Sequence, residues 1–372
     1  MNLAQHPDMA EATRLTREGR LTEATSLLQR LLSGTASPEP ALQPAPMPEV
    51  ATEAARVHMP DVLRKLVDRV KGLGAGLGLG TKPAPVPEGG RFIDASFTNA
   101  AGTRAYKLYI PSGYHGQPVP LLVMLHGCTQ SPDDIAAGTG MNTLAEANAM
   151  LVAYPAQDQA ANPQRCWNWF VPADQRRERG EPSLIAGITR EVMHDYAVDS
   201  RRVYVAGMSA GGAAAAIMGL AYPELYAAVG VHSGLAAGAA SDLASALSAM
   251  KQGESISPNG NDRVPTIVFH GDQDKTVSAR NAERVVAQAL AGAAGLRTEI
   301  EQGEVEGGHA YSRTLYQDAS GRTLVERWQV HGAGHAWSGG NPAGSFTDPH
   351  GPDASREMLR FFLAHQGATA AS

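Results

Sequence analysis

A serine flanked by glycines is the residue pattern with the clearest chemical meaning in this chain. Ser209 lies in Gly207-Met-Ser-Ala-Gly211, after the apolar run 203–206 and before a helical stretch of small residues. The G-x-S-x-G pattern in this context places a nucleophile on a sharp strand-to-helix turn, where the glycines leave room for the crowded backbone. The N–H groups that begin the following helix favour a developing oxyanion. We therefore interpret Ser209 as a catalytic nucleophile, the alternative being an ordinary glycine-rich turn.

A serine hydroxyl also needs an acid that orients its base. In one common chain order the acid follows the serine and the histidine comes last. The apolar run 266–269 is followed by His270-Gly-Asp272-Gln-Asp274. We assign Asp274 as the orienting acid. Asp272 is expected to accept hydrogen bonds from N–H groups of the turn, and His270 to be structural at the strand end.

The base is expected after the last strand. The run 324–330 is followed by His331-Gly-Ala-Gly-His335. Because His331 still continues the strand, we interpret it as structural. His335 lies on the glycine-rich loop beyond it and can reach back to Ser209, so we assign it as the general base. Three further histidines are expected to be plain core or surface residues: His232, His350 and His365.

A serine nucleophile of this kind needs two N–H donors that bind the oxyanion. One is expected from Ala210, the residue after the nucleophile. The other is expected from Cys128, in the loop after the apolar run 121–125, where Gly127 allows close approach of the backbone. A thiol nucleophile at Cys128 is the alternative, but no separate activating histidine accompanies it.

These residues must be positioned by a regular array of strands and helices. Strands are expected at 91–97, 104–110, 121–125, 151–154, 203–206, 227–231, 266–269 and 324–330. Helices are expected at 142–149, 184–196, 211–222, 279–291 and 355–365. Apolar strands that alternate with helices predict an α/β fold, a mostly parallel central sheet with helices on both faces. The segment 234–264 shows no long apolar lid, which favours an open cleft over a lipase site.

The first ninety residues differ from this pattern. Residues 1–34 predict an amphipathic helical segment, and residues 35–90 a Pro/Gly-rich linker with one short helix. The glycine run 72–80 lacks the strand and helix that a nucleotide loop requires, so we interpret it as linker. The catalytic domain is expected at 91–366 and a disordered tail at 367–372. The N-terminal helix is expected to pack on its own chain or to contact a polymer surface or granule.

Composition excludes several classes of protein. The chain has 372 residues, 43% of them hydrophobic, and a net charge of -6, which argues against a nucleic-acid partner. Two cysteines cannot form a disulfide scaffold or a four-thiolate zinc site, and we expect no metal ion or other cofactor. No window reaches the length of a transmembrane helix, and no signal peptide is recognisable. The sequence therefore predicts a cytoplasmic location and no membrane span.

Beyond the triad pattern, several longer motifs resemble those of the poly(3-hydroxybutyrate) depolymerase family of esterases. The resemblance is to the short-chain polyhydroxyalkanoate depolymerase type, which is related to feruloyl and acetylxylan esterases. The motifs are Leu125-His-Gly-Cys-Thr-Gln130, Cys166-Trp-Asn-Trp-Phe170, Gly207-Met-Ser-Ala-Gly-Gly212, Val231-His-Ser-Gly234, Phe269-His-Gly-Asp-Gln-Asp274 and Gly334-His-Ala-Trp-Ser-Gly-Gly340. The resemblance covers about residues 91–365.

The resemblance implies an α/β-hydrolase fold and a triad of Ser209, Asp274 and His335. It implies hydrolysis of polyester or oligoester bonds of short-chain hydroxyalkanoates, including polylactide-like polyesters, with feruloyl or acetylxylan ester hydrolysis as the alternative. It further implies a disulfide between Cys128 and Cys166, and it allows a secreted or periplasmic location.

Aromatic residues of these motifs suggest how an acyl or polymer chain would be held. Trp167, Trp169 and Trp337 are candidates for an apolar wall along the substrate, with an ordinary core position as the alternative for each.

Overall fold

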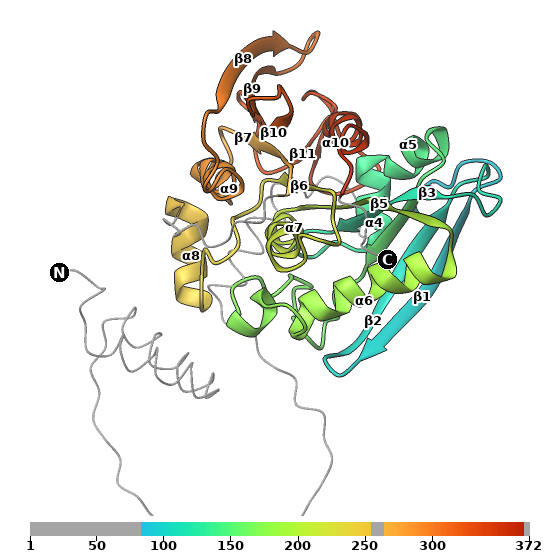
Figure 1. The fold of residues 1–372 in the computed structure, drawn as a ribbon. Helices are drawn as coiled ribbons and strands as arrows, with labels where there is room; N and C mark the ends of the chain where they lie inside the picture. The colour runs from blue at the N-terminus through green and yellow to red at the C-terminus, as the bar shows by residue number, and fades with distance from the viewer. Residues whose placement is uncertain (1–82, 254–263, 368–372) are drawn as a thin grey trace, which may run out of the picture. The chain divides into compact units, whose positions relative to one another are not determined.

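Ten strands form one sheet in the described part of the chain, residues 83–253 and 264–367 of the computed structural model (Figure 1). In spatial order the strands are β1 (Arg91–Asn99), β2 (Gly102–Ile110), β4 (Leu151–Pro155), β3 (Val119–Leu125), β5 (Val198–Met208), β6 (Ala228–His232), β7 (Thr266–Gly271), β10 (Thr323–Val330), β9 (Ala310–Gln317) and β8 (Arg297–Glu304). A short separate pair is formed by β11 (Trp337–Ser338) and β12 (Thr347–Asp348).

The centre of the sheet is parallel. The six strands from β4 to β10 run in one direction, whereas β1, β2, β8 and β9 pair antiparallel at the two ends. The carboxyl ends of β5, β7 and β10 therefore meet at the same edge of the sheet, where ligands of such sheets bind. The predicted mostly parallel sheet is confirmed.

Helices cover both faces of this sheet, as predicted. One core includes side chains of α6 (Gly180–Asp195), α7 (Ala210–Ala221), α8 (Leu243–Gln252) and α9 (Arg280–Ala289). The other includes side chains of α4 (Pro132–Thr139), α5 (Met141–Ala147) and α10 (Ala354–Leu363). A short 3-10 helix, η2, covers Pro172–Gln175.

Strands β3, β4, β6 and β7 are buried along their whole length because both of their faces are covered. In β3, Leu121, Val123 and Leu125 belong to one core, and Leu122 and Met124 to the other. The hairpin β8–β9 has no such signature. Seven of the eight residues of β8 are exposed, so its polar sequence gave no sign of a strand, and the sequence analysis missed it.

Two units make up the chain, residues 1–78 and residues 79–372, and the described residues all belong to the second. The predicted N-terminal helix, the short helix and most of the predicted linker lie outside the described residues. Within the described residues, no helix has the length and apolar character that crossing a membrane requires.

Candidate active site

Ser209 lies on the turn between β5 and α7, in a strained backbone conformation. Its φ is 55° and its ψ is -119°, a region that residues with a side chain rarely adopt and that costs about 1–3 kcal/mol. Two backbone hydrogen bonds hold the turn: Ser209 N–H donates to His232 O at 2.8 Å, and Ser209 O accepts from Ala213 N–H at 3.0 Å. The serine side chain is partly exposed, so a substrate can reach it.

The glycines on both sides of Ser209 are required by contact with the end of β3. A Cβ atom added at Gly211 would lie 2.2 Å from Leu125 O and 2.5 Å from His126 O. One added at Gly207 would lie 2.4 Å from the backbone of Gly211. The turn and the end of β3 are therefore in van der Waals contact through backbone alone.

Gly211→Ala is therefore expected to separate the turn from β3, to destabilise the protein by about 3 kcal/mol and to lower kcat of ester hydrolysis by about 100-fold. Urea unfolding and initial rates would measure both effects. Gly334→Ala is the matched control, because nothing lies within 4 Å of a Cβ atom at that position. Equal effects of the two substitutions would contradict the argument.

Ser209, His335 and Asp274 are joined by hydrogen bonds. The Nε2 atom of His335 lies 2.9 Å from Ser209 Oγ, and its Nδ1 atom lies 2.6 Å from Asp274 Oδ2. Since Nδ1 faces a carboxylate it carries the proton, which leaves Nε2 free to accept the serine proton. The structure thus brings together the three residues that the sequence analysis chose.

Asp274 is buried and held by four donors. Its Oδ1 atom accepts from Thr276 N–H at 2.9 Å and Val277 N–H at 2.8 Å. Its Oδ2 atom faces both His335 and, at 3.3 Å, Nε2 of His270. Burial alone would raise the pKa of Asp274, but the hydrogen bonds from the two histidines outweigh burial and hold the pKa well below its usual range.

The sequence analysis treated His270 as structural and did not foresee its contact with the acid. His270 Nε2 also lies 2.8 Å from Val277 O, so it faces two acceptors and must carry the proton. His270 Nδ1 is buried and has no hydrogen-bond partner among the described residues. His270 therefore donates through Nε2 to the Asp274 carboxylate.

His270→Leu removes this donor, so the pKa of Asp274 is expected to rise and kcat to fall by about tenfold with KM unchanged. Without this donor the Asp274 carboxylate is more basic and holds the imidazolium of His335 more strongly, so the acidic limb of the kcat profile should move to higher pH. His270→Gln keeps an N–H donor and should restore both values. A loss of thermal stability in both variants with wild-type pH profiles would show that His270 only fills space.

The predicted oxyanion donors lie beside the serine. Ala210 is the first residue of α7, so its N–H has no partner within the helix. A Cβ atom added at Gly127 would lie 3.6 Å from Ser209 Cβ, which brings the loop that carries Cys128 against the nucleophile. Gln130, which the sequence analysis did not single out, fixes this loop because its Oε1 accepts from Gly127 N–H at 2.8 Å.

Cys128 and Cys166 are joined by a disulfide in the structure. The bond connects the predicted oxyanion loop to the segment that carries Trp167 and Trp169. Trp167 is fully buried, and its Nε1–H donates to His126 O at 3.0 Å, so this tryptophan also packs against the end of β3.

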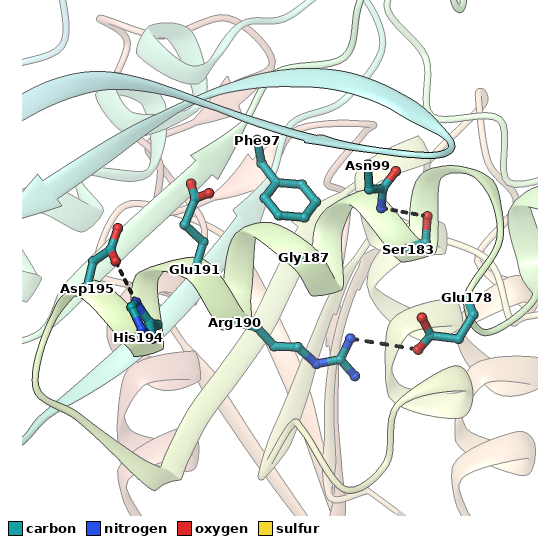
Figure 2. A pocket seen from close by; sticks show the side chains of 9 residues that line it. All are labelled: Phe97, Asn99, Glu178, Ser183, Gly187, Arg190, Glu191, His194 and Asp195. Carbon is teal, nitrogen blue, oxygen red and sulfur yellow. Dashed lines mark hydrogen bonds and ion pairs between the residues drawn. The ribbon is translucent and has the colours of Figure 1, made fainter.

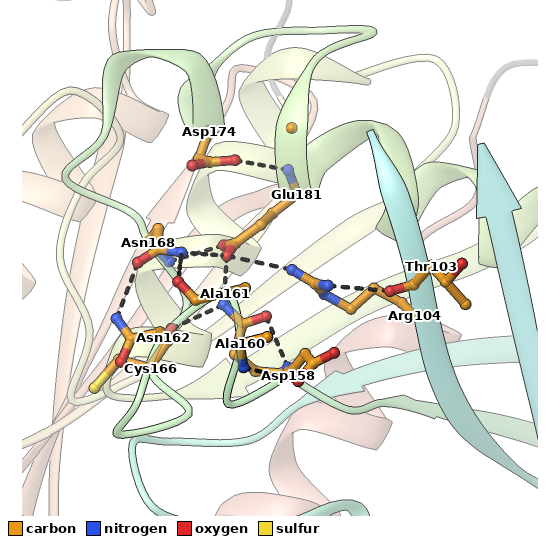
Figure 3. A network of polar contacts seen from close by, with 12 residues as sticks. Thr103, Arg104, Asp158, Ala160, Ala161, Asn162, Cys166, Asn168, Asp174 and Glu181 are labelled. Atoms are coloured by element: carbon orange, nitrogen blue, oxygen red, sulfur yellow. Dashed lines mark hydrogen bonds and ion pairs between the residues drawn. The ribbon is translucent and has the colours of Figure 1, made fainter. Parts of the chain in front are cut away.

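The buried carboxylate of Glu181 forms hydrogen bonds with the same segment (Figure 3). The Glu181 carboxylate accepts from the backbone N–H and the side-chain amide of Asn168, both at 2.8 Å, and from the amide of Gln157. Gln157 also donates to Cys166 O at 2.9 Å, and Arg104 lies 3.9 Å from the carboxylate. Burial, together with nearby Asp174, raises the pKa of Glu181 to about 7.

The structure buries the three tryptophans that the sequence analysis proposed as an apolar wall along the substrate. Trp167 and Trp337 are 0% and 1% exposed, and Trp169 is 6% exposed. Trp337 stacks on His232, with ring centroids 4.7 Å apart, and its Nε1–H donates to Ser355 Oγ. This burial fits the core position that the sequence analysis gave as the alternative for each of them.

Two buried histidines near the site remain neutral. Burial lowers the pKa of His126 to about 4 and that of His232 to about 3. His126 Nε2 accepts from Gln157 N–H, and His232 Nε2 accepts from Ser338 N–H, both at 3.0 Å. Each unprotonated nitrogen thus holds a neighbouring loop.

Because both histidines are neutral when the protein is folded, we expect the free energy of unfolding to fall in acid. The ordinary pKa of about 6.5 applies in the unfolded chain, so stability is complete above that pH and falls by about 1.4 kcal/mol per pH unit for each histidine down to its folded pKa. Glu181, with its raised pKa, acts in the opposite direction between about pH 7 and 4.5. In the wild type, the slope of the free energy of unfolding against pH is therefore the net of these opposing contributions.

His232→Gln keeps an acceptor for Ser338 N–H and removes one titration. The free energy of urea unfolding should fall less steeply between pH 6 and 4 in this variant, by about 1.4 kcal/mol per pH unit. Identical slopes in variant and wild type would contradict a neutral buried His232.

A pocket of about 580 Å³ lies elsewhere on the molecule (Figure 2). It is lined by α6 and by Phe97 and Asn99 of β1, and Figure 2 shows Arg190 reaching toward Glu178 at its side. None of the triad residues lines it, so it is separate from the candidate active site. The described residues hold no group of three or more His, Cys, Asp or Glu side chains that could bind a metal ion.

The parallel sheet, the serine on its strand-to-helix turn, and an acid and a histidine after two later strands define the α/β-hydrolase fold. Residues 104–300 match the family described as esterase PHB depolymerase, which is more than half of the chain. The chain therefore belongs to this family, and the predicted resemblance is confirmed.

Several characterised proteins are similar to the chain. Poly(3-hydroxyalkanoate) depolymerase C of Paucimonas lemoignei is 30% identical over 251 residues, 64% of this chain and 59% of that protein. Feruloyl esterase B of Neurospora crassa is 32% identical over 149 residues, 39% of this chain and 49% of that protein. The chain spans about half the length of such relatives.

A solved structure shows the same fold. The acetyl xylan esterase from Aspergillus awamori superposes with a TM-score of 0.58 at 21% identity, over 73% of this chain and 99% of that one. The fold prediction is confirmed by this match.

Proposed function

We propose that this protein is a serine carboxylic-ester hydrolase that cleaves polyester or oligoester bonds of short-chain hydroxyalkanoates. The observation that carries the proposal is the continuous hydrogen-bonded chain from Asp274 through His335 to Ser209, on the strained turn of an α/β-hydrolase. This arrangement supports acyl transfer through a covalent intermediate.

The first step forms the acyl-enzyme. Ser209 Oγ attacks the ester carbonyl carbon while His335 Nε2 takes its proton, and Asp274 stabilises the imidazolium that forms. The N–H groups of Cys128 and Ala210 bind the oxyanion of the tetrahedral intermediate. As the ester C–O bond breaks, His335 returns the proton to the leaving alcohol.

The second step reverses the roles. Water attacks the acyl carbon while His335 takes a proton from that water. The bond between the acyl carbon and Ser209 Oγ then breaks, and His335 returns the proton to Oγ, which releases the hydroxy acid and the free serine. The low pKa of Asp274 matters here, because a carboxylate that stays ionised keeps His335 in the tautomer that can act as a base.

The family and its relatives support the choice of substrate. Two similar proteins are a poly(3-hydroxyalkanoate) depolymerase and a poly(3-hydroxybutyrate) depolymerase, the latter from Ralstonia pickettii and 25% identical over 238 residues. Matches to an acetylxylan esterase of Aspergillus ficuum, 31% identical over 141 residues, and to feruloyl esterase B favour the second candidate, an esterase of plant cell-wall polymers.

Mass spectrometry of products separates the two candidates. The protein would be incubated with hydroxybutyrate oligomers, polylactide, acetylated xylan and methyl ferulate, with Ser209→Ala as the blank. Release of hydroxybutyrate units above the blank supports the proposal. Turnover of methyl ferulate or acetylated xylan without hydroxybutyrate release would replace it with the second candidate.

A further inference from the structure

Ser312, His331 and Asp272 form a second hydrogen-bonded chain of serine, histidine and aspartate. Ser312 Oγ lies 2.9 Å from His331 Nε2, and His331 Nδ1 lies 3.0 Å from Asp272 Oδ2. The atoms are connected in the same order as in the first chain. We propose that Ser312 is a second activated hydroxyl, which takes up an acyl or phosphonyl group from a small reactive electrophile such as an aryl ester or a fluorophosphonate.

The protonation that activation requires follows from the contacts of Asp272. Its Oδ1 atom accepts from Gly332 N–H at 2.8 Å, which fixes the carboxylate against the turn after β10. Its other oxygen faces His331 Nδ1, so the proton of the neutral imidazole resides there. His331 Nε2 is then an acceptor, and the Ser312 hydroxyl donates to it. This is the tautomer in which histidine acts as a general base.

The second chain is more open to solvent than the first. The side chain of His331 is 39% exposed and that of Asp272 is 25% exposed, whereas the side chain of His335 is 11% exposed. Ser312 is partly exposed on β9. A small electrophile can therefore reach this hydroxyl from solvent.

Oxyanion binding at Ser312 would be weaker than at Ser209. Strand β9 pairs with a neighbour on each side and no helix begins at Ser312, so its surroundings lack the free backbone N–H groups of the first site. Directly opposite Ser312 are Gln329 on β10 and Gln302 on β8, whose side chains share its face of the sheet. Arg327 donates to Gln329 Oε1 at 3.1 Å, which leaves the amide N–H groups as donors. We therefore expect uptake of one group without rapid turnover.

The reaction is a single displacement. With an aryl ester, the Ser312 Oγ bond to the acyl carbon forms, the bond to the phenolate oxygen breaks, and His331 transfers the serine proton to that oxygen. With a fluorophosphonate, the Oγ–P bond forms, fluoride leaves, and the proton passes through His331 to water.

The test uses the full chain with Ser209→Ala, so that the first nucleophile is absent. After exposure to a fluorophosphonate, peptide mass spectrometry compares labelling of Ser312 with that of Ser320. Ser320 is the unactivated control. It lies in a turn, and its Oγ donates to the Asp318 carboxylate at 2.6 Å rather than to a histidine. Ser312 should be labelled at least about tenfold faster, and His331→Leu in the same background should remove that advantage.

Each outcome decides the matter. Equal labelling of the two serines, or labelling of Ser312 that His331→Leu leaves unchanged, would overturn the inference. His331→Gln, compared by thermal unfolding, keeps a hydrogen bond to Ser312 but no base, so it should lose labelling while remaining folded. Labelling of Ser209 in the wild type is read separately: its absence would contradict the proposed function and not the Ser312 inference.

Discussion

Ser209→Ala is expected to lower kcat of p-nitrophenyl butyrate hydrolysis by about 10⁶-fold, because in the proposed mechanism the oxygen of this hydroxyl forms the acyl-enzyme. The backbone of the turn should persist, since the hydrogen bonds of Ser209 to His232 and Ala213 use only main-chain atoms. KM should change little. Steady-state rates on the purified variant, with thermal unfolding to verify the fold, measure the effect.

Ser320→Ala is the control for this substitution, since Ser320 lies on the turn between β9 and β10 and contacts Asp318 only by short-range bonds. It should keep activity within about twofold of wild type. In Ser209→Ala, an activated Ser312 would release at most one equivalent of p-nitrophenol and then stop. Continued turnover by the folded variant would show that another residue is the nucleophile.

The three residues of the proposed triad could be chosen from the sequence because each of them lies next to a strong local signal. Ser209 is enclosed by glycines, and Asp274 and His335 follow strands β7 and β10 within a few residues. A parallel sheet then brings the ends of these strands together without further information. The order of the strands, which no local pattern shows, was not needed for the choice.

The supporting residues could not be predicted in the same way. Gln130, Glu181 and His270 act through hydrogen bonds whose partners are decided by tertiary packing, and their residue types are common in loops and helices. The sequence left the position of the tryptophans open for a related reason. An apolar ring is equally favourable in a core and along an apolar substrate, so residue type alone does not separate the two positions.

Asp274→Asn is expected to lower kcat/KM by about 10⁴-fold while the fold is kept. The N–H groups of Thr276 and Val277 both donate to Oδ1, so the amide oxygen of the new side chain must occupy that place. Its NH₂ group then faces His335 Nδ1, which must accept. The proton moves to His335 Nε2, and this nitrogen can no longer take the proton of Ser209.

Asp272→Asn is the matched control, because it makes the same change two residues away in the same loop. Asp272 contacts Gly332 and His331 but neither Ser209 nor His335. Loss of its carboxylate should therefore lower kcat/KM by less than about tenfold. Rates for both variants would be measured from pH 6 to 9. If Asp274→Asn retained activity within 100-fold of wild type, or if Asp272→Asn were the more damaging change, the acid of the triad would be Asp272 and the orientation argument would fail.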